Sequence, residues 1–232
     1  MPNELLWIIF LLFDLAMVIV AYRLWGRIGL YAMIAGSVII CNIQVVVVVE
    51  MFGLTATLGN IVYASIFLAT DILSENYGKR EARKGIWIGF FCLFWMIAAM
   101  QIAIQFKPSG FDRMMPHLTE IFSFLPRIAI ASLLAYLISQ HHDVWAFHKL
   151  KARTGGRLLW LRNNLSTAVS QLLDSVAFTL IAFWGVFPAS ELFQIVVTTY
   201  LFKVIVAGLD TPFIYLARKI KTAVPAGEGK LI

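Results

Sequence analysis

The chain has 232 residues, of which 60% are hydrophobic and 14% are charged, with a formal net charge of +6 and a mean hydropathy of +0.82. Soluble domains carry about 25% charged residues, so this composition excludes an ordinary soluble domain. Apolar stretches of about 20 residues, which cross a bilayer, recur along the chain and leave no room for a separate soluble catalytic domain. We therefore predict a single integral membrane domain over residues 1–232, with a flexible C-terminal tail at 222–232.

Seven apolar stretches are predicted to be transmembrane helices. In chain order they are 5–22, 28–49, 58–74, 86–106, 120–140, 166–187 and 191–217. The predicted fold class is an all-α polytopic membrane helix bundle with six to seven transmembrane helices. The count stays open because residues 45–62 also fit one bent or re-entrant element.

The distribution of basic residues predicts the topology. Glu4 precedes the first apolar stretch and Arg23 follows it, which suits a retained helix with an outer N-terminus and not a secretory signal. On this layout 15 of the 19 Lys and Arg fall in inner loops, and Lys107 and Arg113 fall outside. The positive-inside rule then gives an outer N-terminus and an inner C-terminus. Topology and anionic lipid explain the basic excess, so no nucleic-acid partner is predicted.

Apart from Glu120 and Glu191, each the first residue of its span, six charged residues fall inside the predicted spans. They are Asp14, Asp71, Arg127, Asp174, Lys203 and Asp210. A charge at the bilayer centre costs roughly 2.5–3.5 kcal/mol. Unpaired, these six would cost on the order of 15 kcal/mol together, which exceeds the stability of a typical protein. We therefore predict that they face a shared interior, of the kind that handles a polar solute.

Polar residues of the sixth span recur on one helical face. Gln171, Asp174 and Phe178 share this face with Thr167 and Ser170. Hydrogen bonding between helices is an alternative role for Ser, Thr and Gln, but it suits an aspartate poorly.

The third and seventh spans carry similar stripes. In the third span the stripe comprises Asn60, Phe67, Asp71 and Glu75, although solvation at the inner end also accounts for Glu75. In the seventh span Lys203 and Asp210 are two turns apart, about 10 Å along the axis, so each needs a partner on another helix or a ligand between them. Pro212 predicts a break or kink just after Asp210.

Two further charges leave alternatives open. Arg127 follows Pro126, on a face turned away from Ser132 and Tyr136, and either an ion pair with an intramembrane aspartate or direct ligand contact accounts for it. Asp14 stands alone on its helix, where packing against a neighbour and a lipid-facing proton carrier are both open.

No metal site and no cofactor are predicted. His141 and His142 are adjacent, so they point about 100° apart on a helix and cannot chelate one ion together. Cys41 and Cys92 lie in apolar spans and are read as small packing residues.

Several of these stretches together resemble the queuosine precursor transporter family, also called the vitamin uptake transporter family. They are Phe67-Leu-Ala-Thr-Asp71 with Glu75; Pro126-Arg127-Ile; Gln171 to Asp174; and Phe202-Lys203 followed by Asp210-Thr211-Pro212. The resemblance implies a cell inner-membrane importer of 7-cyano-7-deazaguanine or 7-aminomethyl-7-deazaguanine, bases salvaged for queuosine in transfer RNA. Family members usually have about six helices, so the first span with Asp14 is a departure.

The stripes and the resemblance together give the candidate ligand-binding residues. They are Asn60, Phe67, Asp71, Glu75, Arg127, Gln171, Asp174, Phe178, Lys203 and Asp210. A carboxylate accepts hydrogen bonds from the ring N–H and amino groups of a guanine-like base, and Lys203, Arg127 or Gln171 suits its carbonyl oxygen. Aromatic rings, including that of Tyr63, stack on flat bases.

Two other functions remain as alternatives. The bundle is also expected to resemble the substrate-binding subunits of energy-coupling-factor transporters, and the Ala32-x-x-x-Gly36 pair would permit close contact with an energy-coupling partner or a second copy. An intramembrane enzyme would need a nucleophile with a base in reach, and the spacing suggests none.

Overall fold

The computed structural model describes residues 2–153 and 159–220. Its first helix is divided into two segments by a break at Gly26. The predicted tail at 222–232 lies outside the described residues. The elements in chain order are α1 (Asn3–Gln44), β1 (Val48–Met51), β2 (Leu54–Thr57), α2 (Asn60–Tyr77), α3 (Lys79–Ala103), α4 (Met115–Arg153), α5 (Leu159–Phe183) and α6 (Ala189–Lys219). The protein is therefore mostly helical, as predicted.

The two halves of α1 correspond to the first two predicted spans. Gly26 has φ 56° and ψ −132°, a conformation that glycine adopts readily and other residues adopt only under strain. The halves also approach closely beside the break, because a Cβ atom on Gly29 would lie 2.2 Å from the carbonyl oxygen of Ala21. One long apolar sequence thus forms two helical segments.

The segment after α1 is a β-hairpin, and the prediction that the second span stays helical to residue 49 is wrong. Val48 pairs with Thr57 and Met51 with Leu54 in an antiparallel ladder. The run from Val45 to Val49 is β-branched and favours a strand. Phe52 and Gly53 have φ of 54° and 73°, as a two-residue type I′ turn requires.

Two hydrogen bonds attach this hairpin to α6. The backbone N–H of Thr55 donates to Gln194 Oε1 at 2.9 Å, and Thr198 Oγ1 donates to the carbonyl oxygen of Thr55 at 3.0 Å. These bonds satisfy the backbone N–H and carbonyl groups of Thr55, which have no strand partner on the side facing α6.

Helix α6 continues as one helix through Pro212, where the sequence predicts a break or kink.

Four of the described helices are long and apolar enough to cross a membrane. The apolar stretches are Asn3–Gln44, Lys79–Ala103, Met115–Ser139 and Ala189–Val206. A shorter one in α5 covers Ala168–Phe183. Charged and polar side chains such as Asn60 and Asp71 lower the hydropathy of α2. The chain is therefore a multi-pass membrane protein, and six to seven transmembrane helices stays a prediction.

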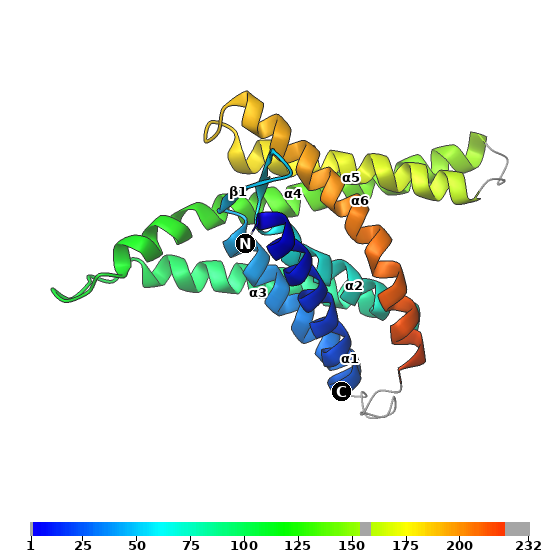
Figure 1. The fold of residues 1–232 in the computed structure, drawn as a ribbon, viewed down its shortest axis with the longest axis horizontal. Coiled ribbons are helices and arrows are strands. Elements are labelled where there is room, and N and C mark those ends of the chain that lie inside the picture. The colour runs from blue at the N-terminus through cyan, green and yellow to red at the C-terminus, as the bar shows by residue number, and fades with distance from the viewer. Residues whose placement is uncertain (1, 154–158, 221–232) are drawn as a thin grey trace.

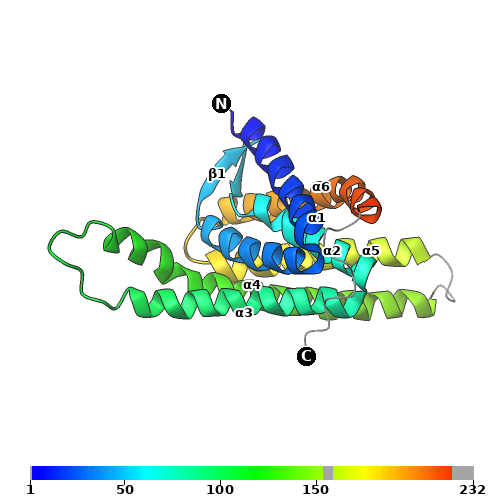
Figure 2. The same cartoon turned by 90° about the horizontal axis from the view of Figure 1, so that it is seen from below.

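The helices form a bundle in which α4 and α5 lie side by side along much of their length (Figures 1 and 2). The α3–α4 loop lies at the far left of Figure 1 and the hairpin near its middle, whereas the α2–α3 junction, the end of α4, the start of α5 and the end of α6 lie toward the right. The largest core cluster lies between α1, α2 and α6 and includes Leu15, Leu68 and Phe202.

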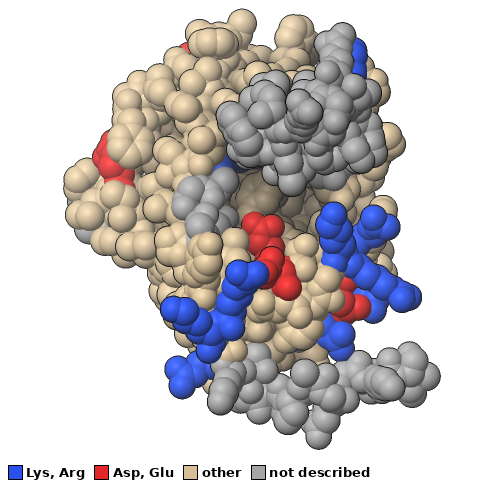
Figure 3. Space-filling view, turned by 90° about the vertical axis from the view of Figure 1, so that its right-hand side faces the viewer, with Lys and Arg blue, Asp and Glu red and all other residues tan. Residues whose placement is uncertain are grey.

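The outer surface is strongly apolar along the bundle and charged at one end. Phe91 and Trp95 of α3 are 72% and 65% exposed, as expected for side chains that face lipid. Figure 3 shows the end that lies to the right in Figure 1, where Lys and Arg side chains gather and acidic side chains lie beside a hollow.

Candidate functional site

Two adjoining cavities lie inside the bundle and share part of their walls. The first has a cavity volume of about 60 Å³ and the second about 230 Å³, both smaller than the 300–1,000 Å³ typical of small-molecule sites. The residues that line both are Cys41, Asn42, Tyr63, Ser132 and Asp174. The first cavity also reaches Asn60, Phe178, Thr199 and Lys203, and the second reaches Phe67, Thr70, Tyr136, Ser139 and Gln171.

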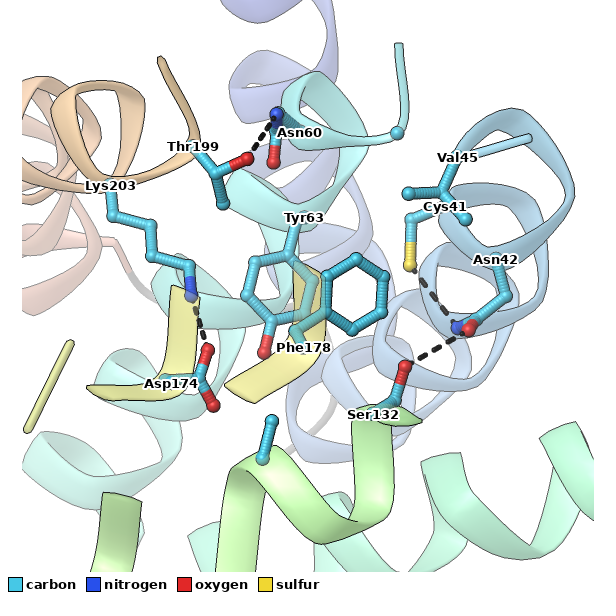
Figure 4. A pocket seen from close by; sticks show the side chains of 12 residues that line it. Cys41, Asn42, Val45, Asn60, Tyr63, Ser132, Asp174, Phe178, Thr199 and Lys203 are labelled. Atoms are coloured by element: carbon cyan, nitrogen blue, oxygen red, sulfur yellow. Dashed lines mark hydrogen bonds and ion pairs between the residues drawn. The ribbon is translucent and has the colours of Figure 1, made fainter. Parts of the chain in front are cut away.

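An ion pair between Asp174 and Lys203 forms part of the first cavity wall (Figure 4). Asp174 comes from α5 and Lys203 from α6, and their side chains are 15% and 8% exposed. The other carboxylate oxygen of Asp174, Oδ1, lies 3.4 Å from the Ser139 hydroxyl of α4, which donates to it. Three helices thus position one carboxylate at the junction of the cavities.

Aromatic rings form the wall beside this pair. The Lys203 ammonium lies 5.7 Å from the centre of the Tyr63 ring, close enough for a cation–π interaction. Figure 4 shows the Tyr63 and Phe178 rings between the Asp174–Lys203 pair and the Asn42–Ser132 pair. In the second cavity the Phe67 ring packs edge-on against Tyr63, with centroids 4.9 Å apart. Flat apolar faces therefore lie next to charged hydrogen-bonding groups.

Two amide side chains add hydrogen-bonding groups to the walls. Asn60 Nδ2 donates to Thr199 Oγ1 at 3.3 Å and to the carbonyl oxygen of Thr57 at 3.2 Å, which joins the start of α2 to α6 and the hairpin. Asn42 Oδ1 accepts a hydrogen bond from Ser132 Oγ at 3.3 Å, which joins α1 to α4.

The structure brings six of the ten candidate ligand-binding residues to the cavity walls. These are Asn60, Phe67, Gln171, Asp174, Phe178 and Lys203. Their proximity agrees with the predicted stripes, and their role in binding stays a prediction.

Arg127 lies outside both cavities and binds the C-terminal end of α5. Its Nε donates to the carbonyl oxygen of Ile181 at 2.8 Å and its Nη2 to that of Trp184 at 2.6 Å. Helix C-termini carry unsatisfied carbonyls and partial negative charge, which a guanidinium compensates. These contacts differ from the predicted ion pair with an intramembrane aspartate, and direct ligand contact by Arg127 stays a prediction.

Two carboxylates of the predicted set, Asp71 and Glu75, are not among the cavity-lining residues. Asp71 is exposed on α2, two turns beyond Tyr63 and Ala64. Glu75 forms an ion pair with Arg218 near the end of α6. The side chain of Asp210 lies outside the described residues. Helical periodicity placed Asp71 and Glu75 on a stripe but did not specify how far along α2 the cavities extend.

Asn42, Cys41 and Tyr63 are cavity residues that the candidate set omits. Asn42 is a buried polar residue in an otherwise apolar run of α1, which is a usable signal. Cys41 and Cys92 are free thiols. Among the described residues no group of three or more His, Cys, Asp or Glu side chains could hold a metal ion.

Comparison with known proteins identifies relatives of the chain. The family model described as "Putative vitamin uptake transporter" matches residues 57–217. A protein of Bacillus subtilis (strain 168) named "Probable queuosine precursor transporter" is 44% identical over 221 residues, which cover 95% of this chain and 96% of that protein. The "Queuosine precursor transporter" of Escherichia coli (strain K12) is 30% identical over 172 residues, covering 72% and 74% of the two chains.

A third relative, "Probable queuosine precursor transporter" of Haemophilus influenzae (strain ATCC 51907 / DSM 11121 / KW20 / Rd), is 32% identical over 158 residues, or 67% of this chain and 65% of that protein. No solved structure matches the chain significantly. The family description and the three names denote transporters, not enzymes. The chain therefore belongs to the vitamin uptake transporter family, as its sequence resemblance predicts.

Proposed function

We propose that this protein is a multi-pass importer of the cell inner membrane that carries queuosine precursors, and that it binds their 7-deazaguanine base in the cavity beside Asp174 and Lys203. The observation that carries the proposal is this ion pair, which lies in a cavity wall inside an apolar bundle. Charged groups at such depth are costly and usually mark a substrate pathway. The names of the three relatives supply the substrate class.

The cavity chemistry suits a guanine-like base. The Asp174 carboxylate accepts hydrogen bonds from a ring N–H and an exocyclic amino group, while the Lys203 ammonium donates to a carbonyl oxygen. Tyr63 and Phe178 offer ring faces for stacking, and the Asn42 and Asn60 amides offer both donors and acceptors. The substrates proposed are 7-cyano-7-deazaguanine and 7-aminomethyl-7-deazaguanine.

The charge distribution supports the direction of the bundle in the membrane. The α2–α3 junction, the end of α4, the start of α5 and the end of α6, where the sequence concentrates Lys and Arg, lie toward the same end of the bundle (Figures 1 and 3). By the positive-inside rule this end faces the cytoplasm, so the N-terminus lies outside.

Uptake by purified protein in liposomes that contain no ATPase tests the proposal. Labelled 7-cyano-7-deazaguanine should enter liposomes with the wild-type chain and not those with the Asp174→Asn variant, while Glu120→Gln, which changes an exposed carboxylate, should transport normally. Uptake that the Asp174→Asn variant performs at the wild-type rate would remove Asp174 from the site.

The alternative is a substrate-binding subunit of an energy-coupling-factor transporter, and one observation favours it. Ala32 is exposed, and a Cβ atom on Gly36 would meet no described atom within 4 Å, so this small-residue pair is open to another chain. A purified chain that binds the base but transports it only with an added ATPase module would support this alternative.

A further inference from the structure

Asp14 is a buried carboxyl group that the proposed binding site does not use. It lies on the first half of α1 in a stripe with Trp7, Leu11 and Val18, all of which are buried. The residue is only 7% exposed, so it does not face lipid. Its Oδ2 atom is buried and has no hydrogen-bond partner.

The neighbours of Asp14 supply too few donors for an ionised carboxylate. The polar group that acts on it from α2 is Ser65. The Ser65 hydroxyl also lies 2.7 Å from Ser37 Oγ and 2.8 Å from the carbonyl oxygen of Val62. A hydroxyl carries one proton, whereas an ionised carboxylate has about four acceptor positions. These surroundings therefore suit a protonated, neutral carboxyl group.

Charged groups on the elements around α1 are engaged elsewhere. Among the described residues no Lys or Arg forms a salt bridge with Asp14, and the titratable group that interacts with it electrostatically is the Cys41 thiol. Among the other charges on these elements, Glu81 of α3 binds Arg27, Tyr31 and Lys84, and Lys203 of α6 pairs with Asp174. Arg127 of α4 binds carbonyl oxygens, and Glu75 of α2 pairs with Arg218. Glu50 of β1 and Asp71 of α2 are exposed.

The helices that hold Asp14 are also helices that line the cavities. Ser65 is two residues from Tyr63 and from Phe67, so it points from the opposite side of α2. Ser37 lies one turn from Cys41, which lines both cavities. Ionisation of Asp14 would therefore place a negative charge at the contact between α1 and α2. Because other faces of the same two helices line the cavities, a change at this contact would also change the cavity walls.

We infer that Asp14, with Ser65 and Ser37, is a proton-binding site that couples import of the base to proton entry; this rests on the proposed function. The carboxyl group takes a proton from the outer side before the loaded bundle changes state and releases it to the inner side. One proton enters per base, and no covalent bond of the base changes. A neutral Asp14 keeps the α1–α2 contact closed. Ionisation of Asp14 favours the conformation in which the carboxylate accepts a new proton from the outer side.

Proteoliposomes loaded with a pH-sensitive dye test this coupling. The probe is labelled 7-cyano-7-deazaguanine, with the outside medium either acidic or equal in pH to the interior. Wild-type protein should accumulate the base only with an acidic exterior, and the dye should report proton entry with it. Asp14→Asn, which mimics the protonated group, should exchange labelled for unlabelled base but show neither accumulation nor proton entry. Glu120→Gln should match the wild type.

Base transport by the wild type without proton entry would overturn the inference, as would proton-driven accumulation by Asp14→Asn. If Asp14→Asn does not fold, Ser65→Ala decides in its place, because loss of the hydroxyl should shift the external pH of half-maximal accumulation and an unshifted profile refutes the inference. Wild-type protein that exchanges the base but moves no protons refutes the coupling alone. Wild-type protein that neither binds nor exchanges the base refutes the proposed function.

Discussion

The Asp174 carboxylate of α5 and the Lys203 ammonium of α6 form an ion pair inside the bundle, with side chains 15% and 8% exposed. Removing one partner of a buried pair leaves the other charge without compensation, which costs about 3–5 kcal/mol of folding free energy. Replacing both partners with neutral groups of similar volume costs far less. Each charge therefore depends on the other for stability, whereas the pair as a whole adds little to folding, so its part in ligand binding under the proposed function can be measured separately.

The first prediction concerns stability. Asp174→Asn and Lys203→Met should each lower the free energy of unfolding by about 3 kcal/mol, whereas the double variant should recover most of this loss. Thermal unfolding of the purified variants in detergent measures the effect. Glu120→Gln is the control, since that side chain is exposed. Single variants as stable as the wild type would show that neither buried charge depends on the other for compensation.

The second prediction concerns Arg127, which binds carbonyl oxygens at the end of α5 and lines neither cavity. Arg127→Ala should lower the free energy of unfolding by about 1.5–3 kcal/mol because two charge-assisted hydrogen bonds are lost. Arg127→Lys should recover only part, since one ammonium cannot reproduce the guanidinium geometry.

The affinity of the remaining folded Arg127→Ala protein for the base should stay at the wild-type value. Equilibrium binding per folded molecule measures it, and a tenfold weaker affinity in folded Arg127→Ala would instead assign this residue to the binding site.

The contrast between α5 and α2 shows what the sequence can predict. Gln171, Asp174 and Phe178 recur at helical spacing and all reach the cavity walls, because the middle of α5 lies beside them. In α2 the same spacing joins Asn60 and Phe67, which reach a cavity wall, to Asp71, which does not. Periodicity specifies a face of a helix, whereas the depth of a cavity depends on neighbouring helices.

The third prediction concerns the aromatic wall. If Tyr63 stacks on the base, Tyr63→Leu should weaken binding by about 5- to 150-fold, the range that corresponds to 1–3 kcal/mol per stacked base. Tyr63→Phe keeps the ring and should bind nearly as well. Phe193→Leu is the matched control because Phe193 is 68% exposed on α6. Equal losses for Tyr63→Phe and Tyr63→Leu would point to the hydroxyl and not to stacking.

The fourth prediction concerns the break in α1. Gly29→Ala should lower the free energy of unfolding by about 1–3 kcal/mol, because its Cβ would lie 2.2 Å from the Ala21 carbonyl oxygen and the two halves of α1 would have to move apart. Gly36→Ala on the same helix should have no such cost, since nothing lies within 4 Å of its Cβ. Thermal unfolding in detergent compares them, and equal stabilities would contradict the close contact at the break.

Local propensity explains why the sequence prediction failed after α1. The run from Val45 to Val49 is hydrophobic enough to continue a transmembrane helix, yet it is β-branched and is followed by the turn at Phe52 and Gly53. Hydropathy alone does not distinguish a buried strand from the end of a helix. The contacts of Arg127 were not predicted for a related reason, since its carbonyl partners come from a helix end whose position the sequence does not specify.

The position of the bound base tests the central claim most directly. An experimental structure of the wild-type protein with 7-cyano-7-deazaguanine should place the base in the cavity lined by Tyr63 and Phe178, with its N–H groups within hydrogen-bonding distance of the Asp174 carboxylate and its carbonyl oxygen near Lys203. A base bound elsewhere, with the Asp174–Lys203 pair intact and the cavity occupied only by water or lipid, would contradict the account.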